Sequence, residues 1–300
     1  MNATTSLRWM FATSFLALLG LSLPLQAQTL LLEYKFNDSG TTTANSGSLS
    51  TQNANLVASD FTTATDLHGT AGSGVSGQAG DKALNLTSAT GQGSGFTGPA
   101  AVTATGGLGA LKSFTLTGWY NAATTGGNAR LFDDGSVLTG KGITLWMSGT
   151  NQLNLTINGV QTSFAVNSTL ALTNTWVFYA VTYDSSLTSN NISLYVGTTS
   201  TNSALASTAT TTSLPGDVAN NPTVSLVLGN QTAANQRPFD GLMDNVRLYG
   251  SATDASGVLS GLAIENLRSL DVVPEPNSMA LLVSGALVLG FFARRRAMAI

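Results

Sequence analysis

Residues 176–183 read WVFYAVTY, and this stretch decides the fold. Nearly all of its side chains are apolar or aromatic. A strand with one face in water would instead alternate between apolar and polar residues. Since both faces of this segment have to be covered, we predict that it is a central strand of a buried sheet.

Strand patterns continue on both sides of this segment. Residues 113–120 (SFTLTGWY) alternate in the manner of a strand. Asn158-Gly159 separates two alternating runs, and such a pair favours a tight hairpin because both turn residues need positive φ. Further strands are predicted at residues 30–36, 152–157, 160–164, 191–196, 225–228 and 241–249.

Short strands separated by Gly, Asn and Ser turns predict an all-β, two-sheet antiparallel sandwich with about ten to twelve strands. One helix is predicted over residues 254–270, although Gly257 and Gly261 weaken it. Residues 198–213, rich in Ser, Thr, Ala and Asn, are interpreted as a flexible loop, with a polar edge strand as the alternative. The Gly/Ser-rich residues 69–80 indicate another loop.

The composition excludes several classes of function. Residues 28–275 hold eight basic residues and all 15 acidic ones, a net charge of −7, so no nucleic-acid partner is expected. The chain has no cysteine, which excludes a zinc–thiolate site and a cysteine nucleophile. Its stability therefore has to come from a conventional core, with help from a metal ion as a further option.

The two ends of the chain carry targeting signals. Residues 1–27 have the apolar core and small-residue end of a secretory signal peptide. Near the other end, Pro274, Glu275 and Pro276 precede an uncharged apolar stretch over residues 277–293. At about 1.5 Å per residue this stretch is just long enough for a transmembrane helix. It is followed by Arg294, Arg295 and Arg296, which the positive-inside rule keeps in the cytoplasm.

These parts in this order resemble a bacterial PEP-CTERM protein, whose sorting signal would span residues 273–297 here. The resemblance implies an exosortase-type processing enzyme as a partner and cleavage near the Pro-Glu-Pro motif. It also implies a Gram-negative host that makes exopolysaccharide. The protein would be exported, anchored in the inner membrane by the C-terminal helix, and then found at the cell surface or outside the cell.

The middle of the chain resembles a laminin-G-like, concanavalin A-like jelly roll. The segments that carry this likeness are residues 32–38, 82–86, 113–119, 176–183 and 239–249. The resemblance implies a jelly-roll domain over residues 28–250, with a short helix and linker over residues 251–272. Asn245 departs from the pattern, because many relatives have a carboxylate there.

Many laminin-G-like domains bind calcium, and calcium prefers oxygen ligands. The oxygen-rich candidates are Asn37, Asp38 and Asn45 in an early loop, together with Asp244. These residues are the candidates for a structural calcium ion, which is the only cofactor that the sequence suggests. In the alternative interpretation, Asn37 and Asp38 cap a turn, and Asp244 pairs with Arg247 or lies at a rim.

The sequence offers few candidate catalytic residues. The single histidine, His68, is interpreted as a solvated loop residue. Glycoside hydrolysis needs two carboxylates across one sugar ring. The adjacent Asp133 and Asp134 are interpreted as part of a turn, while Asp240 and Asp244 have same-face spacing within the closing strand. We therefore predict no enzyme activity, with a glycan-cleaving enzyme as the least favoured alternative.

The leading functional prediction is a non-catalytic jelly-roll domain that binds glycan or packs within exopolysaccharide. A structural or adhesive module that contacts other proteins is the alternative. Sugars stack on exposed aromatic rings. Trp119 and Trp176 lie in apolar strands and are predicted to be buried, whereas the pattern around Trp146 leaves its environment open. No ligand-binding residue is assigned from the sequence.

Overall fold

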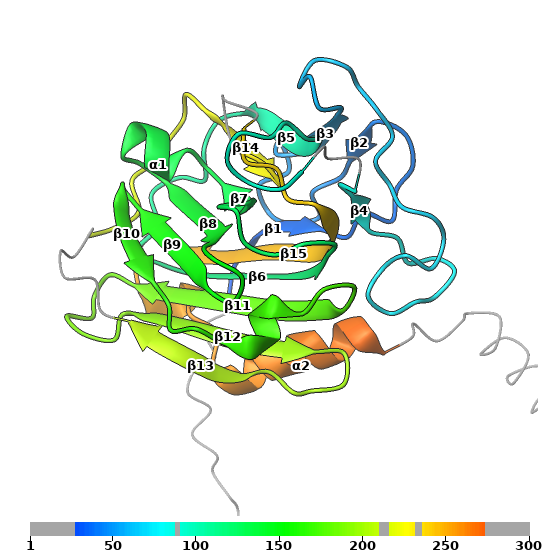
Figure 1. Cartoon of the computed structure of the whole chain (residues 1–300). Helices are drawn as coiled ribbons and strands as arrows, with labels where there is room; N and C mark the ends of the chain where they lie inside the picture. The colour runs from blue at the N-terminus through cyan, green and yellow to red at the C-terminus, as the bar shows by residue number, and fades with distance from the viewer. Residues whose placement is uncertain (1–27, 88–90, 210–215, 232–235, 274–300) are drawn as a thin grey trace, which may run out of the picture.

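The computed structural model describes residues 28–87, 91–209, 216–231 and 236–273. Within these residues the strands form two antiparallel sheets, of seven and eight strands, that pack face to face (Figure 1). The predicted all-β two-sheet sandwich is confirmed, and it is consistent with a jelly roll. No helix among the described residues is both long and apolar enough to span a membrane. The predicted signal peptide (residues 1–27) and C-terminal helix (residues 277–293) lie outside the described residues.

The seven-stranded sheet has the order β1-β15-β6-β11-β12-β13, and β4 pairs with β15 beside this path. Its strands are β1 (Leu30–Tyr34), β4 (Leu84–Asn85), β6 (Ser113–Ala122), β11 (Trp176–Asp184), β12 (Ile192–Thr198), β13 (Ala204–Ala209) and β15 (Gly241–Ser251).

The eight-stranded sheet has the order β10-β9-β8-β7-β14-β5-β3-β2. Its strands are β2 (Thr42–Thr43), β3 (Ala54–Val57), β5 (Ala100–Thr105), β7 (Arg130–Asp133), β8 (Ile143–Met147), β9 (Leu153–Ile157), β10 (Val160–Ser163) and β14 (Ser225–Leu228). The short helix α1 (Ser136–Thr139) connects β7 to β8, and the 3₁₀ turn η1 (Ser168–Ala171) follows β10.

Strand β11 is the predicted central strand, paired with β6 on one side and β12 on the other. Its odd-numbered residues, such as Val177, Tyr179 and Val181, face the main core between the sheets. Phe178 and Ala180 face the opposite way into a second apolar cluster. Both faces of the strand are therefore covered, which explains its nearly continuous apolar sequence.

Helix α2 (Gly261–Val272) covers this second cluster and lies across the outer face of the seven-stranded sheet (Figure 1). Ile264 is fully buried there beside Trp119. The helix begins later than the predicted start at residue 254, because the preceding segment packs against β6. The 3₁₀ turn η2 (Ala255–Gly257) places Gly257 so close to the backbone of Ser113 that a side chain would not fit.

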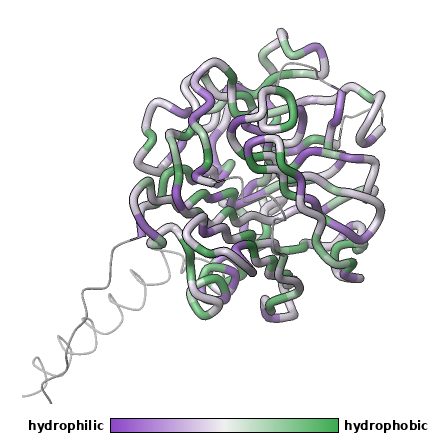
Figure 2. Tube along the Cα trace, turned by 90° about the vertical axis from the view of Figure 1, so that its left-hand side faces the viewer, coloured by the Kyte–Doolittle hydropathy of each residue, from purple (hydrophilic) through white to green (hydrophobic). Residues whose placement is uncertain are grey.

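In the eight-stranded sheet, successive side chains alternate between the main core and the outer side. In β8 and β9 the odd-numbered residues all belong to the main core cluster. The trace in Figure 2 accordingly changes between hydrophobic and hydrophilic residues at short intervals across the domain. The predicted hairpin joins β9 to β10, with φ values of 50° at Asn158 and 79° at Gly159.

Residues 204–209 form the edge strand β13 paired with β12, so the flexible-loop interpretation is wrong for them and the alternative of a polar edge strand is confirmed. Their short polar side chains suit an edge where one side of the strand has no neighbour. The polar composition that suggested a loop thus reflects position at the edge of the sheet.

Candidate functional site

The residues predicted to bind calcium fall into different surroundings. Asn37 and Asp38 line a cavity of about 390 Å³ at one edge of the sandwich. Oδ1 of Asn37 accepts a hydrogen bond from the backbone N–H of Lys82 (2.7 Å), and Nζ of Lys82 donates to the carbonyl oxygen of Asp38 (2.8 Å). The Asp38 carboxylate accepts from the backbone N–H of Ala44 through Oδ2 (2.9 Å). An ammonium group therefore already lies beside these oxygens.

Asn45 and Asp244 are held by the backbone. Oδ1 of Asn45 accepts from the N–H groups of Glu33 (2.8 Å) and Gly47 (2.9 Å). The two oxygens of the fully buried Asp244 accept from the N–H groups of Val75 (2.9 Å) and Asn245 (2.7 Å). Either residue would have to exchange backbone hydrogen bonds for metal contacts. The calcium ion stays a prediction, and no group of three or more metal-binding His, Asp or Glu side chains occurs in the part of the chain that the structure describes.

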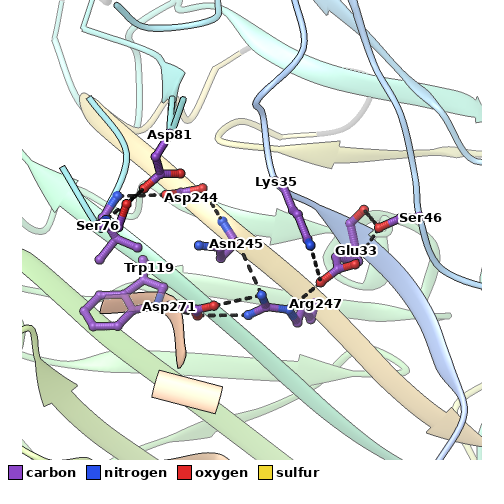
Figure 3. Close-up of polar contacts among 11 residues, drawn as sticks. Glu33, Lys35, Ser46, Ser76, Asp81, Trp119, Asp244, Asn245, Arg247 and Asp271 are labelled. Atoms are coloured by element: carbon purple, nitrogen blue, oxygen red, sulfur yellow. Dashed lines mark hydrogen bonds and ion pairs between the residues drawn. The ribbon is translucent and has the colours of Figure 1, made fainter. Parts of the chain in front are cut away.

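Asp244 lies beside Asp81 and Asn245, as Figure 3 shows. Burial, reinforced by the negative charge of Asp81, raises the pKa of Asp244 well above its ordinary value. Asn245 adopts a left-handed conformation (φ 48°) at a shift of register in β15. This bulge lets Met243 and Val246 both face the core while Asp244 and Arg247 both face outward.

Arg247 anchors helix α2 to the sheet (Figure 3). Its Nη1 and Nη2 donate to the two carboxylate oxygens of Asp271 at 2.9 and 2.8 Å, and its Nε donates to Glu33 at 2.8 Å. Trp119 also donates to Asp271 through its indole nitrogen (2.8 Å). A second cavity, of about 280 Å³, borders this network and is lined in part by Arg247, Asp271 and Asp81. The alternative of an Asp244–Arg247 pair is not seen, because Arg247 pairs with Glu33 and Asp271.

A different surface lies on the eight-stranded sheet, on the side that faces away from the core. We call it the Trp146 face. It is formed by side chains of β7, β8 and β9: Arg130, Asp133, Thr144, Trp146, Asn154 and Thr156. Strand register places Trp146 opposite Arg130 and Asn154, and Thr144 opposite Asp133 and Thr156. One partly exposed aromatic ring thus lies over hydroxyl, amide and charged groups that are themselves no more than 3% exposed.

The polar groups of the Trp146 face are not all satisfied internally. The guanidinium carbon of Arg130 lies 4.8 Å from the centre of the Trp146 ring, and Nε and Nη1 of Arg130 are buried without a hydrogen-bond partner. Oδ1 of Asn154 is likewise buried without a partner. Asp133 is held by the hydroxyl of Thr144 (2.5 Å). Buried polar groups are normally paired, so this face departs from the usual pattern.

The remaining catalytic candidates are separated. The side chain of His68 is only 2% exposed, which corrects the interpretation as a solvated residue; Nδ1 lies 2.8 Å from Asp66 and Nε2 is buried without a partner. Asp240 precedes β15 and is partly exposed, whereas Asp244 is buried within the strand. Asp133 and Asp134 are both 1% exposed. Burial raises the pKa of Asp134 to about 8, with a further contribution from Asp133.

Sequence reasoning did not single out Arg130, and it left Trp146 open. A signal for Trp146 was present, because ITLWM alternates and places Trp146 opposite Ile143, Leu145 and Met147. Arg130 had no comparable signal, since its contact with Trp146 joins two strands that are separate in the sequence.

Comparisons with known families agree with this architecture. A family model described as the concanavalin A-like lectin/glucanases superfamily matches residues 92–258, which is more than half of the chain. The model of the PEP-CTERM protein-sorting motif matches residues 272–296. No curated protein sequence matches the chain.

Several solved structures resemble the fold. Domain 4 of AbnA, a GH43 extracellular arabinanase from Geobacillus stearothermophilus in complex with arabinotriose, is 15% identical; the match covers 80% of this chain and 98% of that one, with a TM-score of 0.51. The botulinum neurotoxin serotype D/C binding domain is 14% identical over 81% of this chain and 52% of that one, with a TM-score of 0.48. The CBM40 of Ruminococcus gnavus IT-sialidase, bound to alpha2,3 sialyllactose, is 14% identical over 53% and 83%, with a TM-score of 0.38.

Proposed function

We propose that this chain, which belongs to the concanavalin A-like lectin/glucanases superfamily, is an exported surface protein whose β-sandwich binds glycan without cleaving it. The observation that carries the proposal is the Trp146 face. A sugar presents C–H groups that pack on an aromatic ring and hydroxyl groups that need hydrogen-bond partners. Trp146 is partly exposed and offers its ring. Thr144, Asn154 and Thr156 are 0–2% exposed and support the ring from below, with the indole N–H donating to Thr156 at 3.4 Å, so the hydroxyl groups of a bound sugar would be met at the rim of this face.

Catalysis is not part of this proposal. Hydrolysis of a glycosidic bond needs two carboxyl groups that reach opposite sides of the bond. Asp133, which belongs to this face, and its neighbour Asp134 are both 1% exposed. Neither can approach a sugar ring unless the structure around it moves.

Sorting is the second part of the proposal. An exosortase-type enzyme would recognise Pro274, Glu275 and Pro276 and release the domain from a helix over residues 277–293. The PEP-CTERM match supports this route. Mass spectrometry of the mature protein should then find a C-terminus that lacks Arg294, Arg295 and Arg296. A mature chain that retains these arginines would exclude cleavage.

The glycan-binding proposal can be tested by affinity electrophoresis of the purified full chain through gels that contain neutral or acidic polysaccharides, including the exopolysaccharide of the producing cells. Trp146→Ala should abolish retardation, and Trp146→Phe should keep part of it because a ring remains. Leu262→Ala removes a side chain that is 73% exposed on α2, on the other side of the sandwich, and serves as the control. If the folded protein binds none of the glycans, a structural or protein-contacting role is favoured instead.

A further inference from the structure

The four arginines in the described part of the chain fall into two groups. Arg247 and Arg268 are each bound by carboxylates, Arg247 by Asp271 and Arg268 by Glu265 (Nη2 to Oε1, 2.7 Å). Arg130 and Arg237 form no ion pair with any described residue. An arginine removed from water normally receives a carboxylate partner, so the buried Arg130 is unusual.

Arg130 and Arg237 are neighbours. The backbone N–H of Arg130 donates to the carbonyl oxygen of Arg237 (3.0 Å). The Arg130 side chain is buried against Trp146, with the residue only 3% exposed, whereas Arg237 is partly exposed and donates through Nε to Gln231 (3.0 Å). One cation therefore lies beneath the aromatic ring, and the other lies where a ligand can reach it.

The carboxyl groups nearby do not neutralise both charges. Burial, together with the like charge of Arg237, lowers the pKa of Arg130 to about 10, so Arg130 still carries its charge at neutral pH. The negative charge of Asp133 acts to raise the pKa of Arg130, but the Asp133 carboxylate also accepts hydrogen bonds from the hydroxyl of Thr144 and from the N–H of Gly135 (3.1 Å). Asp134, with its pKa raised to about 8, is mostly protonated at neutral pH. Two positive charges thus face one negative charge.

We propose that this site binds an anionic sugar: Arg237 contacts the carboxylate or sulfate group directly, Arg130 supplies a second positive charge from beneath, and the sugar ring lies on Trp146. Guanidinium groups bind such planar or multi-oxygen anions through paired hydrogen bonds. The unpaired Nε and Nη1 of Arg130 add to a positive potential that Asp133 offsets only in part. This inference rests on the proposed glycan-binding function and names the class of glycan.

The test uses the full chain in detergent and isothermal titration at low and high salt. The ligands are oligogalacturonate, its carboxyl-reduced neutral form, and a sulfated oligosaccharide, so that the type of anion is distinguished. Arg237→Gln should weaken binding of the acidic ligand about tenfold to a hundredfold, which is the range of a charge-assisted hydrogen bond, and should leave the neutral form unchanged. Arg130→Gln should act in the same direction, whereas Arg130→Lys, which keeps the charge, should retain most of the affinity. Lys141 is an exposed cation just before the start of β8, so Lys141→Gln is the matched control for the lost charge.

Binding of the acidic ligand should also weaken at high salt, because screening reduces attraction between charges. Equal affinity for the acidic and neutral forms, or an unchanged affinity in folded Arg237→Gln, would overturn the anionic site and leave glycan binding intact. Failure of every ligand to bind would overturn both proposals. Arg237 is partly exposed, so its variant should fold even if removal of Arg130 destabilises the domain.

Discussion

Removal of the Asp271 carboxylate should destabilise the domain strongly. Asp271 is the partner of Arg247 through two hydrogen bonds and also accepts from the indole of Trp119. The side chains of Arg247 and Asp271 are 8% and 5% exposed, so the pair is screened little by water. In Asp271→Ala, Arg247 keeps Glu33 as its one carboxylate partner and a longer hydrogen bond to Oδ1 of Asn245 (3.3 Å), and Trp119 loses the acceptor of its buried N–H.

The magnitude follows from these contacts. Loss of one partner of a buried ion pair costs about 3–5 kcal/mol, and an unsatisfied buried donor costs about 1–3 kcal/mol. Glu33 remains on Arg247 and fraying of the last turn of α2 relieves part of the penalty. We therefore expect a loss of about 4 kcal/mol in the free energy of unfolding, which lowers the ratio of folded to unfolded protein about a thousandfold.

The assay is urea unfolding of residues 28–273 followed by circular dichroism. Lys35→Ala is the matched control, because Lys35 is 49% exposed and its nitrogen lies 4.0 Å from Glu33, at the edge of the same network. An exposed pair of this kind should contribute less than about 1 kcal/mol. If Asp271→Ala costs no more than this control, the network does not anchor α2 and the reasoning is refuted.

Three other outcomes are expected. Burial raises the pKa of Asp134 to about 8, so between about pH 4 and pH 8 the folded state keeps a proton that the unfolded state has lost. The free energy of unfolding should therefore fall as the pH rises through this range. Asp134→Asn should make this fall smaller in urea titrations at several pH values. Gly159→Ala should cost about 1–2 kcal/mol in thermal unfolding, because residue 159 has φ 79° and a methyl group disfavours that conformation. If calcium binds at Asn37 and Asp38, chelation should lower the melting temperature of wild type but not of Asp38→Ala; no change in wild type would argue against the ion.

Local patterns in the sequence were sufficient for most of the strands. WVFYAVTY forms a strand buried on both faces, and Asn158-Gly159 forms the hairpin. Both signals come from residues close together in the chain, so no long-range contact is needed to interpret them. β13 was taken for a loop because its pairing with β12 is not visible in its own composition.

The candidate sites required the tertiary structure. The Arg247 network joins β1, β15 and α2, and the Trp146 face joins β7, β8 and β9. A shift of register at Asn245 decides which side chains of β15 face outward, and simple alternation does not reveal it.

The sequence by itself determined the fold class and the sorting signal, because hydrophobic period, turn residues and a linear motif are all local properties. Only the tertiary structure decided which charges are neutralised. Arg247 and Arg268 form ion pairs with carboxylates, while Arg130 and Arg237 are joined only through their backbones and form no ion pair with a described residue. This difference depends on which strands and loops the fold brings together. Electrostatic energy depends on distance and burial in space, and the sequence records neither of these directly.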